Sequence, residues 1–120
     1  MSWTCRMVDP STAARARPGD MWYLPEPIPA HLARLAPEHA GQRPLILVLP
    51  GPCRFSVFGP TWSAGGAGPS GWAVSGEPPL ITLTPSIDVK GIYHGYVRDG
   101  VITDDIDGRR FNDDGRRIYG

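Results

Sequence analysis

Glycine and proline interrupt this sequence so often that they leave room only for short regular elements. The chain has 15 glycines and 14 prolines among its 120 residues, and they stand between short apolar runs rather than in tracts. Proline fixes φ and removes a backbone donor, and glycine favours turns, so each element between them can hold only a few residues. This spacing predicts short strands joined by turns.

Apolar and aromatic runs between these turns predict about six or seven short strands. In chain order the runs are Met21–Leu24, Leu45–Leu49, Arg54–Phe58, Gly71–Gly76, Leu80–Leu83, Ile92–Val97 and Val101–Thr103. Leu45–Leu49 is apolar at every position, which favours a central place in a sheet, and a short link makes it a hairpin with Arg54–Phe58. We expect the segment Thr84–Ser86, which contains a proline, to end the strand Leu80–Leu83.

The run Ile92–Val97 has the alternation of a strand with two different faces. The alternation places Ile92, His94 and Tyr96 on one face and Tyr93 and Val97 on the other. Gly95, in the middle of the run, indicates a bulge or a close approach of another group to the backbone. Asp99 and Gly100 follow as a two-residue hairpin signal, and Val101–Thr103 is the returning strand.

The predicted fold class is mainly β: an antiparallel sheet, or a small sandwich or barrel, with one short helix. The helix is expected at Pro29–Ala36, where apolar residues fall on one face. Residues 1–19 are polar and without a clear period, so we expect an N-terminal arm there, with one helical turn over Ala13–Arg17 capped by Asp9–Thr12. Residues 20–120 are expected to form a single β-rich domain.

Charge and hydropathy exclude several kinds of partner. Lysine plus arginine and aspartate plus glutamate are equal at 12 each, so no net field attracts nucleic acid or anionic lipid. The longest apolar run, Leu45–Leu49, is too short to span a bilayer, and residues 1–20 lack the apolar segment of a signal peptide. We therefore expect neither a nucleic-acid nor a membrane partner, and no secretion by a signal peptide.

His94 is the first candidate for chemistry. It lies between aromatic residues beside a segment rich in aspartates, where Asp104 or Asp105 could orient the imidazole as a general base or metal ligand. The alternative is a histidine that is packed among aromatic rings and hydrogen-bonded to the backbone. No nucleophile stands nearby in the sequence, which favours that alternative.

Metal sites have only weak support. The segment Thr103–Asp114 partly follows a calcium loop, with Asp105 and Asp107 at ligand positions, but an arginine breaks the pattern and no helix flanks it. Cys53 and His94 are the candidates for a zinc site assembled from distant residues, although no CxxC or HxH pair is present. We therefore predict no cofactor.

Partner binding is the remaining class of function. Arg6, Arg15 and Arg17 crowd the N-terminal residues, whereas aspartates crowd the C-terminal ones, so this asymmetry could orient the chain on a protein. Trp62, in the glycine-rich segment Thr61–Ser70, is a fourth candidate contact. The aromatic residues could also form a stacking platform, but in so small a domain they more often form the core.

Four blocks of sequence carry a family resemblance. They are Pro18–Leu24 (PGDMWYL), Gly71–Pro79 (GWAVSGEPP), Thr84–Ile87 (TPSI) and Tyr93–Ile102 (YHGYVRDGVI). In these blocks the chain resembles a family of small hypothetical proteins of bacteriophages and prophages, some of which carry the label ammonia monooxygenase. More distant relatives look zinc-binding, with a CPxC pair and a Cys-His pair, of which this chain keeps only Cys53 and His94. The resemblance implies a phage origin and a shared fold, but no reaction.

The sequence as a whole predicts a non-enzymatic bacteriophage protein. We expect a small protein-binding domain that serves as an accessory component of the virion, in the capsid or tail, with phage structural proteins as partners and a homo-oligomer left open. The first alternative is a host-directed accessory or anti-defence factor. The second is a small metal-dependent hydrolase or metal-binding protein centred on His94. The expected location is the host cytoplasm or the virion.

Overall fold

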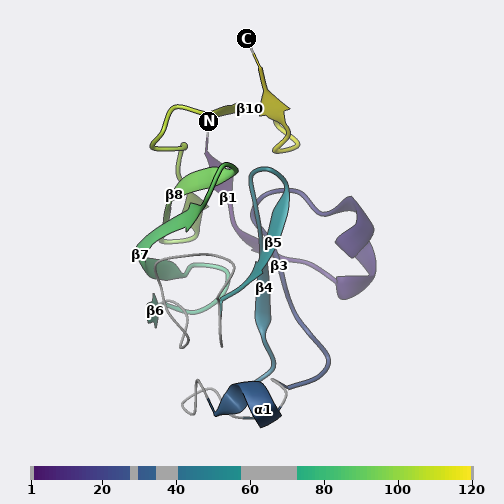
Figure 1. Cartoon of the computed structure of the whole chain (residues 1–120). Coiled ribbons are helices and arrows are strands. Elements are labelled where there is room, and N and C mark those ends of the chain that lie inside the picture. Colours follow the sequence, from purple (N-terminus) through teal and green to yellow (C-terminus); the bar gives the residue numbers. More distant parts are fainter. Residues whose placement is uncertain (1, 28–29, 35–40, 58–72, 120) are drawn as a thin grey trace.

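The computed structural model describes residues 2–27, 30–34, 41–57 and 73–119. In these ranges the protein has eleven short strands, one 3-10 helix and one short α-helix (Figure 1). Strands account for 43% of the residues and helix for 6%, so the predicted mainly β fold class is confirmed. No helix in the described part is long and apolar enough to cross a membrane.

The larger sheet has five strands. In spatial order they are β1 (Trp3–Thr4), β9 (Val101–Ile102), β8 (Tyr93–Arg98), β7 (Thr82–Val89) and β6 (Ala73–Ser75), and every neighbouring pair is antiparallel. The turn between β8 and β9 is the one that the sequence predicted, because Asp99 and Gly100 both have positive φ, at 47° and 75°. Such a pair of residues matches the right-handed twist of the two strands.

The smaller sheet has four strands. In spatial order they are β2 (Arg6–Met7), β3 (Asp20–Tyr23), β4 (Leu45–Leu49) and β5 (Cys53–Ser56). The predicted hairpin is present, since β4 and β5 pair antiparallel from Leu49 opposite Cys53 to Ile46 opposite Ser56. β4 also has the predicted central position, whereas β2 and β3 pair in parallel.

The remaining elements are short. β10 (Arg110–Phe111) and β11 (Arg117–Ile118) form a separate hairpin, and η1 (Pro10–Arg15) is a 3-10 helix. The predicted cap is present at η1, because the amide of Ser11 donates to Asp9 Oδ1 at 2.8 Å, although the helix begins earlier than expected. α1 (Ala30–Ala33) lies within the predicted helix, and residues 29 and 35–36 of that prediction lie outside the described ranges.

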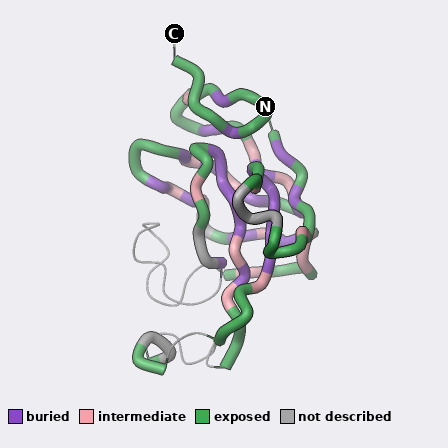
Figure 2. Tube along the Cα trace, turned by 90° about the vertical axis from the view of Figure 1, so that its right-hand side faces the viewer, coloured by how far each residue is buried: buried purple, intermediate pink, exposed green. Residues whose placement is uncertain are grey.

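One hydrophobic core is shared by both sheets. Fully buried members come from each: Leu45, Leu47 and Leu49 from β4, and Ile87, Tyr93 and Val97 from β7 and β8. Figure 2 shows this buried stretch running through the centre of the molecule, with exposed turns at its ends. The arrangement is the small sandwich that was one of the predicted forms.

The predicted division into an N-terminal arm and a separate domain is corrected by residues 3–7. Trp3 and Cys5 are buried core residues, at 8% and 3% exposure. β1 pairs with the larger sheet, β2 pairs with the smaller sheet, and the amide of Cys5 between them donates to Gly100 O at 2.7 Å. These strands have only two residues each, which is too short to give a periodic signal in the sequence.

The prediction that a strand ends at Thr84–Ser86 is also wrong. β7 continues through this segment to Val89, and its pairing with β8 shifts register between Leu83 and Ile87. Such an irregularity accommodates Pro85, which has no amide to donate to a neighbouring strand. The described residues contain more strands than the predicted six or seven, because several strands of two residues gave no signal in the sequence.

Other groups approach the backbone closely at Gly95, as its position in β8 predicted. A Cβ atom there would collide with the hydroxyl oxygen of Tyr93 and would lie 3.1 Å from the backbone oxygen of Asp104. The Tyr93 hydroxyl donates to Thr103 O at 2.8 Å, and burial raises the pKa of this phenol to about 12. The missing side chain at residue 95 therefore makes room for a buried tyrosine and its hydrogen bond.

We predict that Gly95→Ala destabilises the fold by about 2 kcal/mol or more, because the added methyl group overpacks the site. Tyr93→Phe removes the hydroxyl oxygen that this methyl group would strike, but it keeps the ring carbon Cζ, which would lie 2.6 Å from the added Cβ. The double variant should therefore recover only part of the loss, and it should be less destabilised than the two single losses added together. Urea unfolding of the four proteins measures both quantities. Strict additivity would contradict the assigned clash with the hydroxyl oxygen.

Candidate functional site

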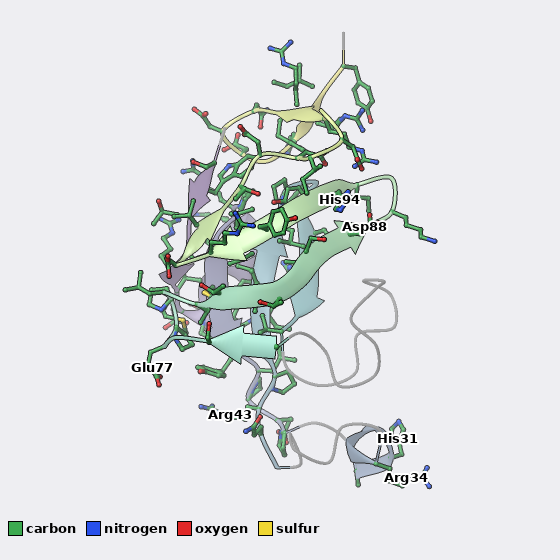
Figure 3. All side chains as sticks on the ribbon, turned by 90° about the vertical axis from the view of Figure 1, so that its left-hand side faces the viewer. His31, Arg34, Arg43, Glu77, Asp88 and His94 are labelled. Carbon is green, nitrogen blue, oxygen red and sulfur yellow. The ribbon has the colours of Figure 1, made fainter. Side chains whose placement is uncertain are left out.

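His94 lies on β8 between two aspartates. Its Nδ1 atom is 3.2 Å from Asp107 Oδ2, and the histidine side chain is 26% exposed. Asp88 stands directly opposite His94 in the register of β7 with β8, and Figure 3 shows the two side chains at the same end of this strand pair. The predicted pairing of His94 with an aspartate is therefore present, but the partner of the imidazole is Asp107 rather than Asp104 or Asp105.

Asp105 has a different role from the one predicted. It is buried, and its carboxylate accepts hydrogen bonds from the backbone amides of His94 at 3.0 Å and Asp107 at 2.7 Å. The Arg109 guanidinium donates to the same carboxylate at 3.0 Å and also lies 3.4 Å from Asp107. Asp105 thus holds the turn that follows β9 against β8, while Asp104 beside it is exposed.

These hydrogen bonds determine the ionisation of Asp105. Burial, the largest single influence, would raise its pKa, but the bonds from the His94 amide, the Arg109 side chain and the other amides outweigh it. The net result is a pKa below the ordinary value for aspartate. Asp105 is therefore a charged structural group that fixes the position of Asp107 beside His94.

The chemistry open to this cluster is limited. An imidazole beside a carboxylate can exchange a proton, but the charged groups around it mainly bind one another. Among the described residues, no three or more histidine, cysteine, aspartate or glutamate side chains are grouped to hold a metal ion. Cys53 lies on β5 in the other sheet from His94, and burial raises the pKa of its thiol. A protonated thiol is a poor metal ligand and a poor nucleophile.

A hollow on the surface brings two of the predicted partner-binding residues together. This arginine hollow, of about 460 Å³, is lined by Ser2, Trp3, Thr4, Arg6, Arg17, Pro18 and Asp113. Asp20, which is buried, organises it: Oδ1 accepts from Arg6 Nε at 2.6 Å and Oδ2 accepts from the Arg17 amide at 3.0 Å. The side chains of Arg6 and Arg17 are still 61% and 53% exposed.

A second hollow shares part of its lining with the first. This hairpin hollow, of about 620 Å³, is bounded by the β10–β11 hairpin and shares Trp3 and Asp113 with the arginine hollow. Its other lining residues are Asp104, Asp105, Gly108, Arg109, Arg110, Phe111, Asn112 and Ile118. The Trp3 ring meets Phe111 edge to face at 6.0 Å, and its indole Nε1 donates to Asp113 O at 3.4 Å.

The other two predicted partner-binding residues are not part of either hollow as described. Arg15 is exposed at the end of η1 and does not line the arginine hollow. Trp62 lies outside the described residues. Arg6 and Arg17 therefore line one hollow, and partner binding by the four residues stays a prediction.

Sequence reasoning missed the residues that build the hollows. Trp3 lines both hollows, and its indole Nε1 donates to the backbone oxygen of Asp113, which is 110 positions away. Asp20 had no assigned role from the sequence, and Asp107 was considered only as a ligand in a calcium-type loop, not as the partner of His94. The alternation of Trp3 with Cys5 was the one available sign that these first residues form a strand.

Comparison of the chain with known protein families, curated proteins and solved structures finds no match. The resemblance to small phage proteins therefore stays a prediction.

We predict that Asp105→Asn lowers the free energy of unfolding by about 2–3 kcal/mol at pH 7, because Arg109 loses its buried partner. The exposed neighbour gives a matched control, since Asp104→Asn should change it by less than about 0.5 kcal/mol. Chemical denaturation of the three proteins measures the difference.

The wild type and the Asp105→Asn variant also test the lowered pKa of Asp105. A carboxylate with a lowered pKa in the folded state stabilises the protein above the unfolded value of about 3.9, and this stabilisation is lost as the pH falls through the folded value. The difference in the free energy of unfolding between the wild type and Asp105→Asn should therefore shrink as the pH falls from 5 towards 2. A gap that stays constant would contradict the assigned charge.

Proposed function

We propose that this chain is a protein-binding domain without a catalytic role, and that it serves as an accessory component of a bacteriophage particle. In this proposal the arginine hollow is the surface that contacts the partner. The single observation that carries it is the pair of exposed guanidinium groups, Arg6 and Arg17, beside one hollow. The buried Asp20 binds the Arg6 guanidinium and the main-chain amide of Arg17, and the Arg17 guanidinium lies 3.7 Å from the exposed Asp114.

The chemistry of the arginine hollow suits a protein surface with acidic groups. Arginine is enriched in protein interfaces, because its planar guanidinium stacks on rings and binds carboxylates in a fixed geometry. Asp20 uses Arg6 Nε, so this contact orients the guanidinium before any partner arrives. The exposed Ser2 and Thr4 supply hydroxyls at the rim.

The surroundings of His94 support a structural role for that residue instead. Its main-chain amide binds Asp105, its ring binds Asp107, and Arg109 links the two aspartates. Each of these contacts fastens the turn after β9 to β8. The phage origin rests on the four blocks of sequence resemblance.

We predict that the protein is present in many copies in purified particles of the phage or prophage that encodes it. Quantitative mass spectrometry of gradient-purified particles measures the copy number. Absence from the particles would contradict the virion role and would favour the host-directed alternative.

A photo-cross-linking amino acid tests the assigned surface. At position 2, in the lining of the arginine hollow, it should join the chain to one particle protein, whereas at Glu77, an exposed residue that is not part of that lining, it should not. Figure 3 labels Glu77. Arg17→Glu should reduce cross-linking from position 2 about tenfold or more, because it reverses one charge in the hollow.

The matched control is Arg34→Glu, which makes the same charge change at the exposed residue that follows α1. Both variants should keep the thermal midpoint of the wild type, since each arginine is exposed. Equal cross-linking by the Arg17 and Arg34 variants would overturn the assignment of the arginine hollow.

A further inference from the structure

The β10–β11 hairpin carries apolar side chains that the rest of the described chain does not cover. Tyr119 is 81% exposed and Ile118 is 42% exposed, and the guanidinium of Arg117 stacks over the Tyr119 ring at 5.0 Å. Figure 1 shows this hairpin at one end of the molecule. The exposed segment Arg116–Tyr119 thus joins two arginines to two apolar residues.

The hairpin itself is firmly attached to the domain. The amide of Gly51 donates to Gly115 O at 2.7 Å, and the Trp3 indole donates to Asp113 O on the same hairpin turn. Gly115 is buried, and a Cβ atom on it would collide with Pro18. Arg116–Tyr119 is therefore presented in a fixed direction, which reduces the entropy lost when it binds.

The hairpin hollow has the complementary chemistry. Its lining includes the rings of Trp3 and Phe111, three aspartates (Asp104, Asp105 and Asp113) and two arginines (Arg109 and Arg110). Asp104 and Asp113 are exposed, whereas Asp105 is buried and bound by Arg109. An aromatic ring accompanied by arginine fits a hollow that has aromatic rings in its lining and more aspartates than arginines.

We propose that two copies of this chain form a symmetric dimer in which Arg116–Tyr119 of each copy occupies the hairpin hollow of the other. Tyr119 of one copy packs against Trp3 and Phe111 of the second, and the arginine beside it faces Asp113. This assembly goes beyond the proposed function, because it uses the hairpin hollow, which shares Trp3 and Asp113 with the arginine hollow but does not include Arg6 or Arg17.

The symmetry limits the size of the assembly. Each copy supplies one protruding segment and one hollow, so a twofold arrangement satisfies both and leaves nothing to recruit a third copy. Two such contacts bury little surface by the standards of stable complexes, which are typically about 1,600 Å². The dimer should therefore form in a concentration-dependent way in the micromolar range.

Analytical ultracentrifugation of the whole chain, from about 1 to 500 μM, tests this directly. The mass should rise from the 13.0 kDa of the single chain towards twice that value and stop there. Tyr119→Ser should raise the dissociation constant at least about 30-fold, because one anchoring side chain is lost from each hollow. Leu80→Ser, which removes a side chain that is 63% exposed elsewhere, should leave the constant unchanged.

A charge exchange tests which surfaces meet. Asp113→Arg and Arg117→Asp should each weaken the homodimer, because either change places like charges at both contacts. An equimolar mixture of the two variants should restore dimerisation, since a mixed dimer pairs opposite charges at both contacts. Both side chains are exposed, so each variant should fold with the wild-type thermal midpoint.

Three results would overturn the proposal. One is a wild-type mass that stays at the monomer value over the whole range, and another is a dimer that is unaffected by Tyr119→Ser. The third is failure of the mixed variants to associate, because it would remove Asp113 and Arg117 from the contact. Asp113 also lines the arginine hollow, so the separate test of that hollow uses Arg17, which the dimer contact does not include.

Discussion

Residues 3–7 are the constraint on which the rest of the structure depends, because they belong to both sheets. β1 extends the five-stranded sheet, β2 extends the four-stranded sheet, and Cys5 between them is buried and bonded to Gly100. A Cβ atom on Gly19 would collide with the backbone oxygen of Thr4, so the segment also lies directly against the chain that enters β3. This segment has the composition of a loose arm, but it pairs with a strand of each sheet.

The two surface hollows follow from the same placement. Trp3 lines both hollows, its ring meets Phe111 edge to face, and its indole Nε1 donates to the backbone oxygen of Asp113. Removing residues 1–19 would therefore remove core residues together with the binding surface. Single substitutions of exposed side chains are the better probe of function for that reason.

Part of this fold could be predicted from the sequence, because it depends on interactions between neighbouring residues. The turn at Asp99 and Gly100, the close approach at Gly95 and the central position of β4 each depend on a few neighbouring residues. What the sequence could not give depends on distant contacts, such as Trp3 with Asp113. The pairing of His94 with Asp107 rather than Asp105 depends on how the turn after β9 folds, which no periodic pattern records.

Native-state hydrogen exchange at Cys5 and Arg6 tests the central claim, that the first residues are part of the folded unit. The Cys5 amide donates to Gly100 O at 2.7 Å and the Arg6 amide to Gly19 O at 2.9 Å. We predict that both exchange only on global unfolding, with the same free energy as the amide of Thr103, which bonds to Tyr96 O across the β8–β9 pair. Exchange of Cys5 and Arg6 at the rate of a free peptide, with Thr103 still protected, would contradict the account.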